Sequence, residues 1–90
     1  MSEVNEKLYG TADACRMVGI TLRQLDYWIL IGIVTPYLER HGVKFFKRLC
    51  EQDIEILRQV KTLTDEGFLV SRALEKVKRE HPDLFVGKSA

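Results

Sequence analysis

Side chains that can contact nucleic-acid bases lie close together in the first third of the sequence: Thr21, Arg23, Gln24 and Tyr27. An arginine can pair bidentately with guanine and a glutamine with adenine, so Arg23 and Gln24 are candidate base readers. The Tyr27 hydroxyl can instead donate to a phosphate, which fixes the position of a protein without reading sequence. A solvated surface charge is the simpler explanation of Arg23, and its position alone does not decide between the two.

A second group of polar and basic side chains follows: Arg40, His41, Lys44, Lys47 and Arg48. The whole chain has a formal charge of only +1, but residues 11–50 carry six basic and three acidic side chains, against six and seven in residues 51–80. A polyanion should therefore meet the first half of the chain. If about four phosphates are neutralised, the logarithm of the affinity should fall with that of the salt concentration at a slope of roughly −3.6. Solubility is the alternative explanation of this basic group.

The remaining reactive side chains do not indicate an enzyme, a metal site or a cofactor. Cys15 and Cys50 are 35 positions apart, and neither has a second Cys or a His at metal-ligand spacing. Cys15 is expected to be a small buried hydrophobe, and Cys50 to lie nearer the surface. The two histidines, His41 and His81, have no Ser, Cys or carboxylate at a spacing that predicts a shared catalytic site.

Length and composition indicate one domain. A chain of 90 residues can bury one modest core. We predict a flexible N-terminus over residues 1–8, a folded domain over 9–80 and a C-terminal tail over 81–90. The longest apolar run, residues 27–34, is far shorter than the roughly 20 residues that cross a bilayer. We therefore expect no membrane partner, and the absence of a disulfide framework and the polar residues 1–7 favour a cytoplasmic protein.

Helical periodicity predicts four helices, at about residues 11–18, 21–31, 51–66 and 70–80. Thr11 should cap the first helix and Gly19 should end it. Only Ile20 separates Gly19 from Thr21, which opens the second helix. Helices joined by so short a turn must cross steeply, which predicts a helix-turn-helix with Ile20 in its corner. The apolar face of the second helix is expected to consist of Leu22, Leu25 and Ile29.

Between the second and third predicted helices the helical period is lost. Strands are predicted at Val34–Leu38 and Val43–Lys47, with the tip of a small hairpin around residues 39–42. A two-stranded ribbon is marginal alone, so Phe45 or Phe46 should pack it onto the helices. The predicted fold class is mainly α: a winged helix-turn-helix of four helices with a small two-stranded β-hairpin wing.

The order of these motifs resembles the N-terminal DNA-binding domain of the MerR family of bacterial transcription regulators, over residues 9–77. The matching residues are Gly19-Ile20-Thr21, Arg23-Gln24-Leu25-Asp26-Tyr27-Trp28, Gly32-Ile33, Pro36, Lys47-Arg48-Leu49-Cys50, Asp53 and Gly67-Phe68. The resemblance implies a transcriptional regulator that binds double-stranded DNA. Its second helix would enter the major groove and its basic wing would follow the phosphate backbone.

The sequence departs from the family pattern at several positions. Asp26 replaces an arginine of the second-helix motif and would repel a phosphate, while Cys50 and Leu69 replace the usual caps of the third and fourth helices. The long dimerisation helix and the effector site of the family have no counterpart here, so no small-molecule effector site is expected. Useful specificity would require a homodimer on two half-sites, and the sequence contains no heptad seam for one.

Two alternative functions stay open at this point. The first is a protein-interaction module of the chaperone-modulator type, which Asp26 and the low net charge favour and which could dock through Leu84–Val86. The second is an excisionase-like architectural DNA-binding factor, which shares the winged fold and the small size.

Overall fold

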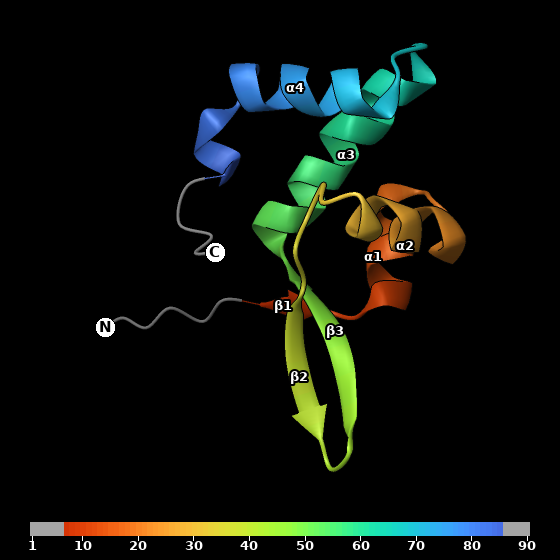
Figure 1. Ribbon diagram of the computed structural model, residues 1–90, viewed down its shortest axis with the longest axis vertical. Helices are drawn as coiled ribbons and strands as arrows, with labels where there is room; N and C mark the ends of the chain where they lie inside the picture. The colour runs from red at the N-terminus through yellow and green to blue at the C-terminus, as the bar shows by residue number, and fades with distance from the viewer. Residues whose placement is uncertain (1–6, 86–90) are drawn as a thin grey trace.

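The computed structural model describes residues 7–85, and Figure 1 shows their arrangement. The elements in chain order are β1 (Leu8–Tyr9), α1 (Thr11–Val18), α2 (Leu22–Leu30), β2 (Tyr37–His41), β3 (Lys44–Cys50), α3 (Glu51–Asp65), α4 (Val70–Glu80) and the 3₁₀ helix η1 (Pro82–Phe85). The helices gather into one body, and the β2–β3 hairpin projects from it (Figure 1). The predicted fold class is confirmed.

The turn between α1 and α2 is as tight as predicted. Gly19 has a φ of 85°, a left-handed conformation that favours glycine, and its N–H donates to the Cys15 carbonyl at 2.8 Å. Ile20 is buried in the corner, and the Thr21 hydroxyl accepts from the Gln24 N–H at 3.1 Å. Thr11 was expected to cap α1, but Gly10 occupies the cap position and Thr11 is the first helical residue.

The hairpin lies further along the chain than predicted. Tyr37–His41 pairs antiparallel with Lys44–Cys50, from Tyr37 opposite Arg48 to His41 opposite Lys44. The prediction for Val34 was wrong because this side chain is buried in the core directly after α2. The connection is Gly42-Val43, with Gly42 at a φ of 65°, so Val43, predicted as the first residue of the second strand, lies in the turn, and residues 39–41 belong to β2 and not to the tip.

A third strand was not predicted. Leu8 pairs with Cys50 and Tyr9 with Leu49, which gives a sheet of order β1-β3-β2. Two residues are too few for a periodic pattern to indicate a strand. Leu8 belongs to the segment predicted as a flexible N-terminus, of which residues 1–6 lie outside the described residues.

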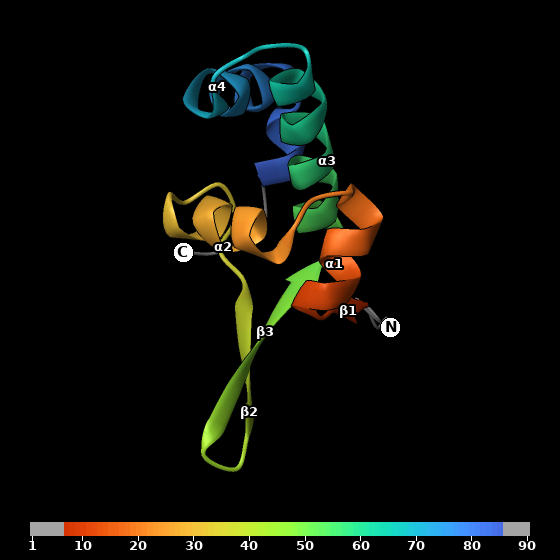
Figure 2. The same cartoon turned by 90° about the vertical axis from the view of Figure 1, so that its right-hand side faces the viewer.

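The core is built around α3, which α1, α4 and η1 contact, while α2 packs on α1 (Figure 2). The buried apolar side chains are Ala14, Ile20, Leu25, Trp28, Ile33, Val34, Leu49, Ile54, Ile56, Leu57, Val60, Ala73 and Val77. Leu22 was expected among them but is 53% exposed. The buried stripe of α2 runs through Leu25 and Trp28, and Leu22 lies on the side of Leu25 away from Trp28.

The wing enters the body without a loop, because α3 begins at the residue after β3 ends. Leu49 and Cys50 are fully buried there, and the Cys50 N–H donates to the buried Asp53 carboxylate at 3.2 Å. Cys50 was predicted to lie near the surface, and this prediction was wrong. Phe45 and Phe46 do not pack the wing onto the helices either, because they are 60% and 43% exposed. The anchoring side chains lie at the inner end of β3 instead.

The segment after α4 folds back onto the body. Leu84 and Phe85 are partly buried against the core, and the Lys78 ammonium lies 5.7 Å from the Phe85 ring centroid. These two residues pack on their own chain and leave little of the predicted docking surface, while Val86 lies outside the described residues. None of the helices within residues 7–85 is long and apolar enough to cross a membrane.

Candidate nucleic-acid interface

One face of α2 is open to solvent. We call it the recognition stripe, and it consists of Leu22, Arg23, Asp26 and Tyr27. Two of its members were predicted as site residues, while Leu22 was assigned to the core and Asp26 to a weakened contact. Gln24 is half-buried, and the Thr21 hydroxyl oxygen is engaged in capping α2. Leu25 and Trp28 form an alternative apolar stripe in the sequence, and the structure buries that stripe and leaves Leu22 outside.

The wing lies beside this stripe. The Lys47 ammonium is 3.9 Å from the Asp26 carboxylate, so the inner half of β3 and the middle of α2 face each other. Both side chains are about half exposed, and an ion pair of this length and exposure contributes between about 0 and 1 kcal/mol. The negative charge that was predicted to repel a phosphate thus has a cation next to it.

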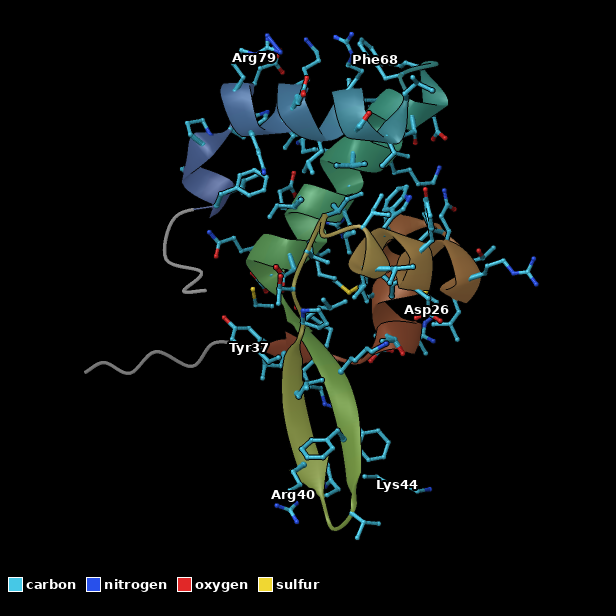
Figure 3. The ribbon with its side chains drawn as sticks, viewed as in Figure 1. Asp26, Tyr37, Arg40, Lys44, Phe68 and Arg79 are labelled. Carbon is cyan, nitrogen blue, oxygen red and sulfur yellow. The ribbon has the colours of Figure 1, made fainter. Side chains whose placement is uncertain are left out.

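Lys44 and Arg40 project from different sides of the wing tip. In Figure 3, Lys44 extends toward the side on which α2 and Asp26 lie, and Arg40 extends toward the opposite side. Arg40 donates from Nε to the Gly42 carbonyl at 2.8 Å, and its guanidinium lies 5.9 Å from the Phe45 ring centroid. Lys47 is thus the wing cation that lies beside α2, while Lys44 and Arg40 lie at the tip and extend to opposite sides of it in this view.

Glu39 joins the last two predicted wing residues. It accepts from Arg48 Nε at 2.7 Å, and its other oxygen lies 3.0 Å from His41 Nε2. The hydrogen bond from Arg48 is the main reason that the pKa of Glu39 lies below its usual value, and His41 adds to the effect. Phe46 lies under both partners, 5.7 Å from the Arg48 guanidinium and 5.3 Å from the His41 ring. Arg48 is therefore neutralised in the free protein.

Glu39 was not among the predicted site residues. Its role depends on the strand register, in which it faces Phe46 and is a diagonal neighbour of Arg48. The predicted strands were displaced, so this pairing could not be found from them. The Lys47–Asp26 pair is long and about half exposed, and such a pair costs little to break when a phosphate arrives, whereas the Arg48–Glu39 pair is shorter and its Arg48 side chain is more enclosed.

Cys15 and the acidic residues form no further reactive site. Partial burial, followed by the negative charge of Asp26, raises the pKa of the Cys15 thiol. The thiol therefore stays protonated at neutral pH and is suited to packing. Among residues 7–85, no group of three or more His, Cys, Asp or Glu side chains is placed to hold a metal ion.

Two helices joined by a tight turn, with a basic hairpin beside the second, define a winged helix-turn-helix protein. Over residues 9–79 the chain matches the model of the MerR HTH family regulatory proteins, and it belongs to that family. The resemblance inferred from the motifs is thus confirmed. The prediction that the chain is not an enzyme agrees with its place among regulatory proteins.

Curated relatives share part of this domain. The uncharacterized HTH-type transcriptional regulators Mb1861 of Mycobacterium bovis and Rv1830 of Mycobacterium tuberculosis are each 40% identical to it over 60 residues. The match covers 66% of this chain and 27% of either relative, so the matched part is about a quarter of each relative's length.

Solved structures share the fold. A MerR-family transcriptional regulator from Bacillus cereus superposes with a TM-score of 0.67 at 15% identity, over 79% of this chain and 52% of that one. HiNmlR, described as a MerR-family regulator that lacks the sensor domain and is bound to promoter DNA, superposes with a TM-score of 0.62 at 23% identity. This match covers 88% of our chain and 65% of HiNmlR.

Proposed function

We propose that this domain binds double-stranded DNA as part of a transcriptional regulator, with α2 in the major groove and the wing along the phosphate backbone. The observation that carries the proposal is the 3.9 Å approach of Lys47 to Asp26, which places a basic ribbon beside the exposed face of α2. Membership of the MerR family supports it, as does the promoter DNA on the similarly folded HiNmlR. The domain proper is proposed to span residues 9–80.

The proposed roles follow from exposure and chemistry. Arg23 reads a guanine from the recognition stripe, and Tyr27 donates its hydroxyl to a phosphate. Gln24 and Thr21 are less open and are proposed to contribute at the edge of the interface. Backbone phosphates are the proposed partners of the wing residues Arg40, His41, Lys44, Lys47 and Arg48.

A salt series tests the proposal. Fluorescence anisotropy with a labelled duplex should give an affinity whose logarithm falls with that of the salt concentration at a slope of roughly −3.6. An affinity that ignores salt, or no binding at low salt, would overturn it. If the chain does not bind duplex DNA but retains a protein partner in a pull-down, the result would instead support the protein-interaction module. A strong bend in a mobility assay would favour the architectural factor.

Two copies on two half-sites are the proposed working unit, in the cytoplasm. A single domain offers few contacts, and its non-specific dissociation constant should be only about 10⁻⁴ to 10⁻⁶ M at physiological salt. Sedimentation with a duplex that holds two half-sites should detect two chains per duplex. One chain per duplex at saturation would contradict the pairing.

A further inference from the structure

An acidic side chain occupies the middle of the recognition stripe. Asp26 lies three residues after Arg23 and four after Leu22, so all three lie along one exposed face of α2. The position costs the protein affinity for a polyanion, because a carboxylate near phosphates is repelled. An exposed carboxylate at this place faces the base edges when α2 enters the major groove.

The chemistry of a carboxylate selects one base edge. An ionised aspartate only accepts hydrogen bonds. In the major groove guanine presents two acceptors, thymine an acceptor and a methyl group, and adenine a donor beside an acceptor, whereas cytosine presents its N4 amino group as a donor. Within a base pair the cytosine amino group has one neighbouring acceptor, the guanine O6, whereas the adenine amino group lies between two, so cytosine is the base from which an aspartate accepts with the least repulsion.

The contact with Lys47 does not block this use of Asp26. Their 3.9 Å separation and half-exposed side chains describe a loose pair. When Lys47 turns to a phosphate, both carboxylate oxygens become free to accept, while the nearby cation still offsets part of the negative charge. Figure 3 shows Asp26 on α2 above the wing, and its contact with Lys47 places the carboxylate on the surface proposed to meet DNA.

We propose that Asp26 determines sequence specificity by accepting a hydrogen bond from the N4 amino group of a cytosine in the major groove. This inference rests on the proposed function and deepens it. Arg23 and Asp26 lie three residues, about 4.5 Å, apart along the helix axis, so the two side chains are expected to contact neighbouring base pairs.

Selection from a randomised duplex library, with the full 90-residue chain, tests the proposal. The wild type should enrich a motif in which cytosine is preferred at one position by about five- to tenfold. Asp26→Ala should lose that preference and keep the rest of the motif, and Asp26→Asn should shift the preference toward adenine, which asparagine recognises. Glu80→Gln is the matched control, because Glu80 is another exposed carboxylate paired with a lysine but lies on α4.

A second measurement removes the chemical group from the DNA. In the selected duplex, the cytosine is replaced by a 2-pyrimidinone nucleotide, which lacks the N4 amino group. The wild type should bind this duplex about fivefold more weakly than the natural one, and Asp26→Ala should bind both equally.

Three outcomes would overturn the inference. Asp26→Ala could select the wild-type motif, or both proteins could respond equally to the missing amino group. Lys47→Ala could erase the same cytosine preference, which would make Asp26 a residue that only positions the wing. A wild type that enriches no sequence would overturn the proposed function as well, whereas enrichment indifferent to Asp26 overturns this inference alone.

Discussion

Arg23 and Lys47 belong to the same proposed DNA surface but differ in what surrounds them. Arg23 projects from the recognition stripe, while Lys47 lies on the wing beside a carboxylate. We expect Arg23→Ala to reduce discrimination against altered base pairs by about 1–3 kcal/mol. Lys47→Ala should weaken all duplexes alike and reduce the salt slope by about 0.9. Anisotropy titrations with single-base variants of one duplex measure both effects, and uniform losses from both proteins would contradict base reading.

The thiol of Cys15 reports on the charge of Asp26. Partial burial and then that charge raise the pKa of the thiol, so the reactive thiolate forms only at a pH above the usual range. Asp26→Asn removes the negative charge, and the thiolate should then form at lower pH and react faster with iodoacetamide at pH 8. Cys50 is fully buried and should stay unmodified in the folded protein, and Cys15→Ala identifies the signal. Equal rates in both proteins would contradict the closeness of the two residues.

At the scale of the element, the wing contains a carboxylate, Glu39, that offsets part of the positive charge of the wing itself. Glu39 accepts from Arg48 and lies against His41, so Glu39→Gln should free Arg48 for a phosphate. We expect tighter binding to every duplex and a salt slope steeper by about 0.9. Because the Arg48 hydrogen bond holds the pKa of Glu39 below its usual value, the difference between the proteins should persist as the pH falls. It should vanish only when the wild-type carboxylate is protonated.

A control separates this effect from a general loss of negative charge. The Lys76 hydrogen bond likewise lowers the pKa of Glu80, and Glu80 lies at the end of α4. Glu80→Gln should leave the salt slope unchanged. A slope altered equally by both substitutions would mean that net charge, and not the release of Arg48, governs binding.

The molecule as a whole depends on α3. Leu57 is fully buried in it, and Leu57→Ala should lower the free energy of unfolding by about 2–5 kcal/mol. This loss is a large part of the free energy of unfolding of a typical domain, which is about 5–15 kcal/mol. Urea unfolding followed by the fluorescence of buried Trp28 and by far-UV circular dichroism should give coincident, earlier transitions. Separate midpoints would show that α2 unfolds apart from the rest.

What the sequence predicts well is what local chemistry determines. Gly19, Ile20 and Thr21 specify the helix-turn-helix because a left-handed residue, an apolar plug and a cap are local requirements. The hairpin register and strand β1 depend on pairing across distant segments, which periodicity does not encode. The error at Leu22 has the same origin, since the choice of buried face on α2 is made by where Trp28 finds its neighbours.

The direct passage of β3 into α3 limits how the wing can move. The Cys50 N–H is hydrogen-bonded to the Asp53 carboxylate and both residues are buried, so the β3 side of the wing is anchored in the core, while the β2 side joins α2 through residues 31–36. We expect this anchoring to hold the wing at a nearly fixed distance from α2. We expect that DNA which must be widened or bent to meet both α2 and the wing carries an elastic cost set by its own stiffness, so that flexible steps such as TA bind better even where no side chain touches them.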